Sequence, residues 1–237
     1  MATPTLEPIL SLVIDAHAMK GSTLLVGVTG GVAVGKSTFS TRLATLLAED
    51  TGLDVAVIAS DGFLHPNETL ANLGLTDRKG FPESYDASAI TNFLGDVRSG
   101  QPTTVPIYDH HTYDIVDGVI TVPPVDVLIF EGVNALQFHN EVDLSIYLHA
   151  EEPVMREWFI QRTATFRDAA RTEYSPFFDP WTDVPDELFL AMVNGAWEGV
   201  NLPNLVDHIE PTRALAHVVI EWEADHEIRA ITFREPT

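Results

Sequence analysis

One segment of the chain, residues 30 to 38, restricts the possible folds more than any other. It reads Gly-Gly-Val-Ala-Val-Gly-Lys-Ser-Thr, the G-x-x-x-x-G-K-S spacing of a phosphate-binding loop. Its glycines let backbone N–H groups surround phosphate oxygens, and the helix that follows adds its positive N-terminal end. The lysine reaches the β- and γ-phosphates, and the serine offers its hydroxyl to Mg²⁺. The predicted nucleotide-binding residues are therefore Gly30, Gly31, Val32, Ala33, Val34, Gly35, Lys36, Ser37 and Thr38.

The residues on either side of this loop support that interpretation. Residues 24–29 form a short apolar run, which predicts a buried strand. Phe39, Leu43 and Leu47 then follow with helical spacing. A chance glycine turn is the alternative, but it would not require strand, loop and helix in this order. The order predicts a site for a nucleoside triphosphate and leaves the reaction at that site open.

Length, composition and charge limit the remaining possibilities. The chain has 237 residues, of which 45% are hydrophobic, and no cysteine, so we expect an α/β core without disulfides or cysteine-bound zinc. No apolar run has the length of a membrane span, and residues 5–20 predict a helix rather than a signal peptide. The net charge of −22 repels nucleic acids and anionic membranes. It is consistent with ordinary solubility or with adaptation to salt. We therefore expect a cytoplasmic protein with a small-molecule substrate and no nucleic-acid or membrane partner.

Strand and helix patterns alternate along the chain. The alternation predicts an α/β fold, a doubly wound and mainly parallel sheet with helices on both faces. We interpret residues 1–237 as a single domain, with an N-terminal helix near residues 5–20 and a helical lid and substrate roof near residues 152–200. Ligands of such folds bind beyond the carboxyl ends of the strands. The predicted strands are 23–29, 54–59, 126–131, 143–148 and 216–222, and the predicted helices are 5–18, 36–50, 87–99, 152–169 and 184–198.

Two carboxylates directly follow predicted strands. Asp61 comes after strand 54–59 and could accept the proton of a substrate hydroxyl that attacks the γ-phosphate. An Asp-Gly turn, in which Asp61 bonds only its own backbone, is an equally good interpretation from local sequence. Glu131 ends strand 126–131 and could hold Mg²⁺ together with Ser37. Its alternative is a solvated strand end, which the phosphate-binding loop makes the weaker choice.

Residues Tyr108 to Asp114 are rich in titratable groups and include the adjacent His110 and His111. Adjacent residues of an extended chain point in opposite directions, and Mg²⁺ prefers oxygen ligands. We therefore interpret this segment as a loop that recognises the substrate, not as a metal site.

The predicted lid carries two arginines and a group of aromatic residues. Arg162 and Arg167 could cover the phosphates, although helical spacing alone favours ordinary ion pairs on the surface. The aromatic residues form either a satellite hydrophobic cluster, which is the more common case, or an apolar roof over a small substrate. They are Phe166, Phe177, Phe178 and Trp181.

Several longer strings resemble the bacterial type I pantothenate kinase family, which belongs to the P-loop kinases that include phosphoribulokinase and uridine kinase. The most specific are DGFLHPN from Asp61 and KGFPESYD from Lys79. The resemblance extends from about Val26 to about Glu227. Further matching strings are Pro106-Ile107-Tyr108 with His110 and Tyr113-Asp114, Phe130-Glu131-Gly132-Val133-Asn134-Ala135-Leu136-Gln137, and Pro211-Thr212-Arg213 with His226.

The resemblance implies ATP-dependent phosphorylation of the primary hydroxyl of pantothenate, the first step toward coenzyme A. It implies that Asp61 is the catalytic base, Lys36 the phosphate-binding lysine and Arg162 the lid arginine. It places His226 near the adenine, and it suggests a homodimer. The substrate-binding residues that it implies, besides Asp61, are Tyr108, His110, Tyr113, Phe159, Phe166, Phe177, Phe178, Trp181 and Asn201.

Two positions depart from the family pattern. The family has a tyrosine where Phe159 stands, so one hydrogen bond to the substrate is missing, which can shift substrate preference strongly. It has an arginine, linked to feedback inhibition by coenzyme A, where Thr41 stands beside Arg42. We expect weak inhibition by coenzyme A here. Two other functions stay open: a kinase for another small acceptor, such as a nucleoside or a sugar, and a nucleotide-dependent regulatory binding protein.

Overall fold

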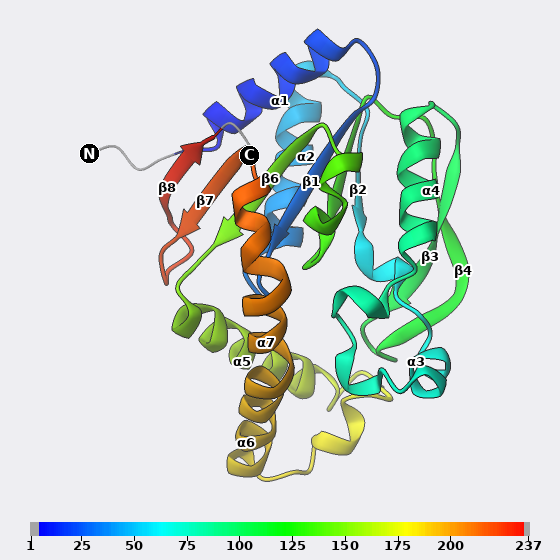
Figure 1. Cartoon of the computed structure of the whole chain (residues 1–237). Coiled ribbons are helices and arrows are strands. Elements are labelled where there is room, and N and C mark those ends of the chain that lie inside the picture. Colours follow the sequence, from blue (N-terminus) through cyan, green and yellow to red (C-terminus); the bar gives the residue numbers. More distant parts are fainter. Residues whose placement is uncertain (1–4, 235–237) are drawn as a thin grey trace.

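A six-stranded sheet forms the centre of the molecule (Figure 1). The computed structural model describes residues 5–234, so residues 1–4 and 235–237 of the predicted domain lie outside the described residues. The strand order is β2-β5-β1-β6-β7-β8, with β8 antiparallel to β7 and the other neighbours parallel. The doubly wound, mainly parallel sheet is thereby confirmed. The strands are β1 Leu24–Gly30, β2 Val55–Ala59, β5 Val127–Glu131, β6 Leu144–His149, β7 Val218–Trp222 and β8 Ile228–Phe233.

Each predicted helix corresponds to a helix of the structure, within a few residues at either end. Their limits follow from local chemistry: the Asp86 side chain accepts a hydrogen bond from the Ala89 N–H at 2.9 Å and begins α4, whereas Gly21, with φ of 65°, ends α1. The short α3 was not predicted. The helices are α1 Glu7–Lys20, α2 Lys36–Thr51, α3 Asn67–Leu73, α4 Ala87–Arg98, α5 Glu152–Ala169, α6 Asp186–Ala196 and α7 Leu202–Asn204.

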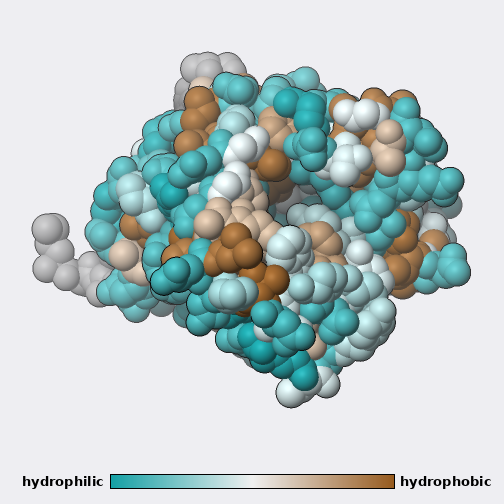
Figure 2. All heavy atoms as spheres, turned by 90° about the horizontal axis from the view of Figure 1, so that it is seen from below, coloured by the Kyte–Doolittle hydropathy of each residue, from teal (hydrophilic) through white to brown (hydrophobic). Residues whose placement is uncertain are grey.

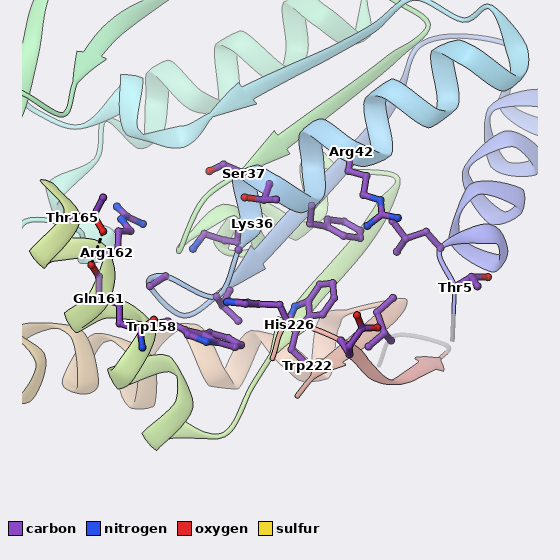
Figure 3. A pocket seen from close by; sticks show the side chains of 18 residues that line it. Thr5, Lys36, Ser37, Arg42, Trp158, Gln161, Arg162, Thr165, Trp222 and His226 are labelled. Atoms are coloured by element: carbon purple, nitrogen blue, oxygen red, sulfur yellow. Dashed lines mark hydrogen bonds between the residues drawn. The ribbon is translucent and has the colours of Figure 1, made fainter. Parts of the chain in front are cut away.

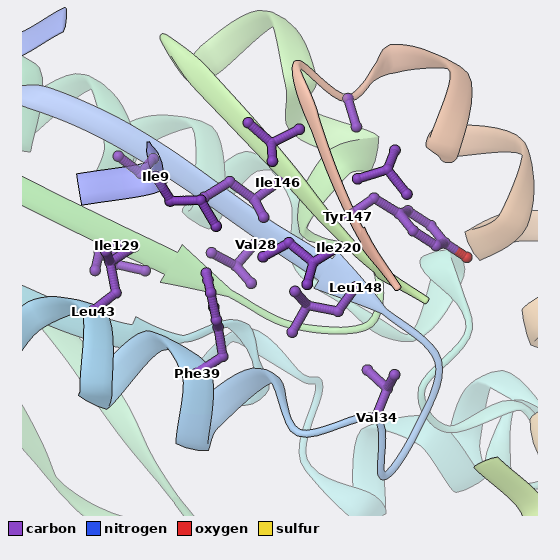
Figure 4. Packing of buried hydrophobic residues seen from close by; sticks show 14 of the residues in the cluster. Ile9, Val28, Val34, Phe39, Leu43, Ile129, Ile146, Tyr147, Leu148 and Ile220 are labelled. Carbon is purple, nitrogen blue, oxygen red and sulfur yellow. The ribbon is translucent and has the colours of Figure 1, made fainter. Parts of the chain in front are cut away.

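Two apolar clusters cover the two faces of the sheet. On β5, Val127 and Ile129 belong to the cluster that includes α1 and α2, whereas Leu128 and Phe130 belong to the cluster that includes α4. Figure 4 shows Phe39 of α2 reaching toward the sheet in the first of these clusters. Because successive residues of a strand point to opposite faces, burial on both sides requires the continuous apolar runs seen in the sequence.

The sequence analysis missed three strands. Residues 108–114, interpreted as a loop, lie at the end of a separate two-stranded hairpin formed by β3 Thr103–Asp109 and β4 Asp114–Val122. Pro106 and Gly118 weaken the strand pattern there, and the pairing register shifts after Pro106. The interpretation as a loop holds only for residues 110–113, at the tip of this hairpin. The edge strand β8 was also missed, because three of its six residues are exposed and the other three half-buried, so it lacks the continuous apolar run of a buried strand.

The predicted helix 184–198 ends too early. Helical structure continues from α6 through π-helical turns at Trp197–Asn201 and Leu205–Ile209, which flank α7. Pro203 lies inside this run, where a proline removes one backbone hydrogen bond, and π-turns are one way to accommodate the defect. Asn201 is therefore inside a continuous helix, not at a helix C-terminus.

The carboxyl ends of the parallel strands all face the lower end of the molecule in Figure 1, where α5 and α6 lie. The β3–β4 hairpin reaches this end beside the turn that follows β2. A Cβ atom at Gly62 would lie 2.5 Å from the Pro106 carbonyl oxygen, so only glycine lets the hairpin approach this turn so closely. Within residues 5–234, no helix combines the length and apolarity needed to cross a membrane.

Candidate active site

The phosphate-binding loop, residues 30–35, turns sharply between β1 and α2. Gly30 and Gly35 have φ of 150° and 91°, and Ala33 has φ of 63°, a conformation that non-glycine residues rarely adopt. A Cβ atom at Gly30 would lie 2.4 Å from the Leu148 carbonyl oxygen. The loop therefore needs glycine where the sequence has it, and it accepts strain at Ala33, as functional loops often do.

Lys36 is folded back over this loop. Its Nζ donates to the carbonyl oxygens of Gly30 at 3.2 Å and Gly31 at 2.9 Å. Burial of the ammonium group lowers the pKa of Lys36 to about 8, although the Glu131 carboxylate opposes this change. Burial likewise raises the pKa of Glu131, in spite of the nearby Lys36. Burial thus disfavours the charged form of both groups, although each charge favours the other.

Ser37 and Glu131 meet at the point where β5 ends beside α2. The Ser37 hydroxyl donates to Oε1 of Glu131 at 2.6 Å, and Glu131 is 5% exposed. Mg²⁺ in kinases is held by one or two protein oxygens together with waters and substrate phosphates. A hydroxyl and a buried carboxylate in contact next to the phosphate-binding loop fit that requirement.

Asp61 lies close to both the phosphate-binding loop and the β3–β4 hairpin. It stands in the 3-10 turn Ser60–Phe63, directly after β2, and is half-buried. Burial lowers the pKa of Lys36, and the Asp61 carboxylate is among the charges that oppose this. Burial also raises the pKa of Tyr108, and the charges that add to the effect include Asp61. The charge of this one carboxylate thus affects the pKa of the phosphate-binding lysine and that of a tyrosine on the β3–β4 hairpin.

The predicted substrate-recognition and roof residues form one chain of ring contacts. Tyr113 stacks on Phe177 with centroids 4.3 Å apart, and Phe177 meets Phe178 edge-on at 4.9 Å. Phe166 lies 5.6 Å from Phe178 and 6.3 Å from His110, while the Tyr108 ring lies 5.1 Å from His110 and 6.0 Å from Tyr113. The hairpin tip therefore packs against α5 and the segment that follows it.

Three residues predicted for the same pocket lie outside this chain of contacts. Trp181 is half-buried in a short 3-10 turn and makes none of the ring contacts found within residues 5–234. Phe159 packs on Trp197, with centroids 5.7 Å apart, at the border of the first apolar cluster. Asn201 is half-buried at the end of a π-turn.

A cavity of about 850 Å³ opens beside the phosphate-binding loop (Figure 3). It is lined by Lys36 and Ser37, by Arg42 further along α2, and by Trp158 and Arg162 of α5. Its size and its continuity with the loop suit a nucleotide, with the phosphates at the loop. Arg162 is exposed, with its guanidinium 5.4 Å from the Phe166 ring, so it lies where the cavity meets the aromatic roof.

His226 also lines this cavity. The family resemblance implies that this residue lies near the adenine. It lies in the turn between β7 and β8, has φ of 66°, and stacks on Trp158 at 4.2 Å. Figure 3 shows the two rings face to face. Arg167, in contrast, is buried against Phe189 and bonds Asp186 at 2.9 Å, so it does not cover the phosphates.

Sequence reasoning missed Trp158 and Lys79. Trp158 carries no motif, and only its place four residues before Arg162 on a helix pointed toward the cavity. Lys79 stands in the KGFPESYD string, which could have identified it. Its Nζ bonds Asn67 Oδ1 at 2.7 Å and the Tyr113 carbonyl, and it lies 5.0 Å from the centre of the Tyr108 ring.

The face of the molecule that carries the carboxyl ends of the strands is hollowed near its middle (Figure 2). Most of this face is hydrophilic, with separate patches of apolar residues around the hollow. A mixed surface of this kind suits a polar ligand.

A phosphate-binding loop between β1 and α2, Asp61 directly after β2, Glu131 at the end of β5, and a mainly parallel sheet together define a P-loop kinase. The chain belongs to the phosphoribulokinase/uridine kinase family, whose sequence signature matches residues 25–172. A protein named "Pantothenate kinase" from Cutibacterium acnes is 38% identical over 94% of this chain and 73% of its own length. Another of that name, from Rhodopseudomonas palustris, is 41% identical over 89% of this chain and 71% of its own length.

The fold is also found in a solved structure. D-glycerate 3-kinase from Cryptococcus neoformans superposes with a TM-score of 0.70 over 98% of this chain and 100% of its own, at 15% sequence identity. At this level of identity the likeness concerns the fold. It agrees with the predicted P-loop kinase architecture.

Proposed function

We propose that this chain transfers the γ-phosphate of ATP to the primary hydroxyl of pantothenate. The observation that carries the proposal is the position of Asp61 in the turn directly after β2, close enough to Lys36 of the phosphate-binding loop and to Tyr108 of the β3–β4 hairpin for its charge to affect the pKa of both. The relatives named pantothenate kinase, which align with nearly the whole chain, support this acceptor over others.

In the proposed reaction the Asp61 carboxylate accepts the proton of the acceptor hydroxyl. The freed oxygen attacks the γ-phosphorus in line, the new O–P bond forms, and the bond to the bridging oxygen of ADP breaks. Lys36 and Arg162 stabilise the charge on the transferring group. The roof excludes water, which would otherwise take the phosphoryl group.

Ser37 and Glu131 would hold Mg²⁺ in this scheme. When bound, the ion neutralises charge on the β- and γ-phosphates. We also propose that the chain forms a single domain and that it is located in the cytoplasm, where ATP is available. The family resemblance suggests a homodimer. Light scattering of the purified chain tests the dimer.

An acceptor screen tests the proposed function. Release of ADP is measured with pantothenate, uridine, a sugar and D-glycerate, with product detection by mass spectrometry. We expect pantothenate to be preferred by a wide margin. A preference for another acceptor would refute the acceptor assignment. MgATP binding with no transfer to any of them would favour a regulatory binding protein.

Asp61→Asn provides the matched control, because it keeps the shape of the side chain and removes its basicity. We expect MgATP to bind as in the parent and turnover to fall about 10²- to 10⁴-fold, the usual contribution of a general base. Unchanged turnover would exclude Asp61 as the base.

A further inference from the structure

The carbonyl oxygen of Gly80 accepts hydrogen bonds from two buried asparagine side chains. Nδ2 of Asn134 lies 2.6 Å from this oxygen, and Nδ2 of Asn204 lies 2.8 Å from it. Asn134 is 3% exposed and Asn204 6% exposed. The three residues come from distant parts of the chain: the loop after β5, the end of α7, and the segment between α3 and α4.

The orientation of both amides follows from chemistry. A carbonyl oxygen can only accept, so each asparagine must present its NH₂ group to Gly80 and turn its Oδ1 away. Both Oδ1 atoms are buried and have no hydrogen-bond partner within residues 5–234. An unpaired buried acceptor costs about 1–3 kcal/mol, so this arrangement is a poor way to gain stability. We therefore look for the role of these two hydrogen bonds in the residues whose positions depend on Gly80.

Gly80 follows Lys79, the cation of the acceptor side. Its φ is 93°, and its own N–H donates to Ser84 Oγ at 2.9 Å, so the segment is held on both sides of the turn. Lys79 Nζ in turn bonds Asn67 Oδ1 and the carbonyl of Tyr113, which has φ of 56° at the hairpin tip. A shift of the Gly80 carbonyl would therefore move Lys79 and release the strained hairpin tip.

The same two asparagines connect the acceptor side with the rest of the site. Asn134 lies three residues after Glu131, the candidate metal ligand, and Asn204 lies three residues after Asn201 on the helix that continues α6. The Gly80 carbonyl thus joins, through two hydrogen bonds, three segments that are far apart in the sequence.

We propose that Asn134 and Asn204 are positioning residues, a two-amide clamp that fixes the acceptor half of the active site through Gly80 and Lys79. This inference rests on the proposed function insofar as it concerns the acceptor. Neither asparagine lines the cavity beside the phosphate-binding loop. Loss of the clamp should weaken use of the acceptor and leave use of MgATP intact.

The test uses Asn134→Asp and Asn204→Asp in the full chain. Each replaces the donating NH₂ by a carboxylate oxygen, which in its ionised form cannot donate to Gly80. Asn194→Asp is the matched control, because Asn194 lies on α6 and also donates from Nδ2 to a backbone carbonyl, that of Leu190, at 2.8 Å. Steady-state kinetics are measured separately for pantothenate and MgATP, and hydrogen exchange is measured for the peptide spanning residues 79–86.

We expect kcat/KM for the acceptor to fall about 10- to 100-fold in both clamp variants, since displacements near 1 Å can cost this much. The KM for MgATP should stay within about twofold of that of the parent, because the substitutions leave the contacts of the phosphate-binding loop unchanged. Because both amides hold one carbonyl, their effects should not add. The double variant should lose no more kcat/KM for the acceptor than the more impaired single variant. Asn194→Asp should behave as the parent.

Equal losses for acceptor and MgATP, or equal effects in Asn194→Asp, would overturn the clamp and leave a merely structural role. If the parent uses a different acceptor, the proposed function fails, and the kinetics are repeated with that acceptor. Hydrogen exchange needs no acceptor: faster exchange of residues 79–86 in the clamp variants alone supports the clamp, and unchanged exchange refutes it. Asn→Ala versions, which add no charge, replace any Asp variant that does not fold.

Discussion

The lowered pKa of Lys36 makes nucleotide binding depend on pH in a way that can be calculated. Burial lowers this pKa to about 8 in the free protein. Bound phosphate requires the charged ammonium, so only the protonated fraction binds well. At pH 9 that fraction is about a tenth, and the apparent Kd for MgATP should rise about tenfold for each pH unit above 8.

Isothermal titration calorimetry checks this directly. Titrations at pH 7, 8 and 9, in buffers of different ionisation enthalpy, report how many protons are taken up when MgATP binds. Uptake should be near zero at pH 7 and approach about one proton at pH 9, because MgATP restores the charge on Lys36. Lys36→Arg is the control, since an arginine stays charged throughout this range. No uptake at pH 9, or the same uptake in Lys36→Arg, would refute the reasoning.

The same shift has a consequence for stability without nucleotide. The folded pKa of Lys36, about 8, lies below its ordinary value of 10.5. Between these values the unfolded chain binds more protons, so the free energy of unfolding should rise with pH there. Lys36→Met should lack this rise, and chemical denaturation at pH 8 and 10 compares the two proteins.

Three further substitutions test individual parts of the site. Glu131→Gln should raise the Mg²⁺ concentration needed for half-maximal activity about 10- to 100-fold, measured by Mg²⁺ titration, and an unchanged requirement would exclude Glu131 as a ligand. Trp158→Ala removes the partner of His226, and the KM for MgATP should rise about threefold to tenfold with the acceptor KM unchanged. Phe159→Tyr should lower the KM for pantothenate about fivefold if its hydroxyl reaches the acceptor; reduced thermal stability with constant KM would show that Phe159 is a packing residue beside Trp197.

The sequence predicted the sheet and most helices because their signals are local. Val127 to Phe130 are apolar on both faces of a strand, and Phe39, Leu43 and Leu47 recur at helical spacing, so period and polarity were sufficient. The β3–β4 hairpin was interpreted as a loop because Pro106 obscures its alternation, and its pairing is a contact between strands, not a property of either one.

The positions of the candidate site residues were predictable where a single residue follows a strand, and not where they depend on contacts between distant parts of the chain. Asp61 and Glu131 follow strand ends, so the parallel topology alone brings them together. The Trp158–His226 stack joins α5 to the β7–β8 turn across 68 positions of chain, and no local pattern records it. For Arg167, helical spacing favoured an ordinary ion pair, and the structure agrees, because its guanidinium bonds Asp186 and packs against Phe189.

The charge distribution explains how so acidic a chain can bind a polyphosphate. With a net charge of −22, the surface repels ATP at long range, but at physiological ionic strength this field is screened beyond about 8 Å. Binding therefore depends on the cationic side chains close to the ligand that are not already paired with a carboxylate. Arg98, Arg156 and Arg213 are each tied to a carboxylate. Arg42 and Arg162 face the nucleotide cavity and form no ion pair within residues 5–234. The acidic surface therefore does not oppose binding at contact range, because its charges are screened while those of the site are not.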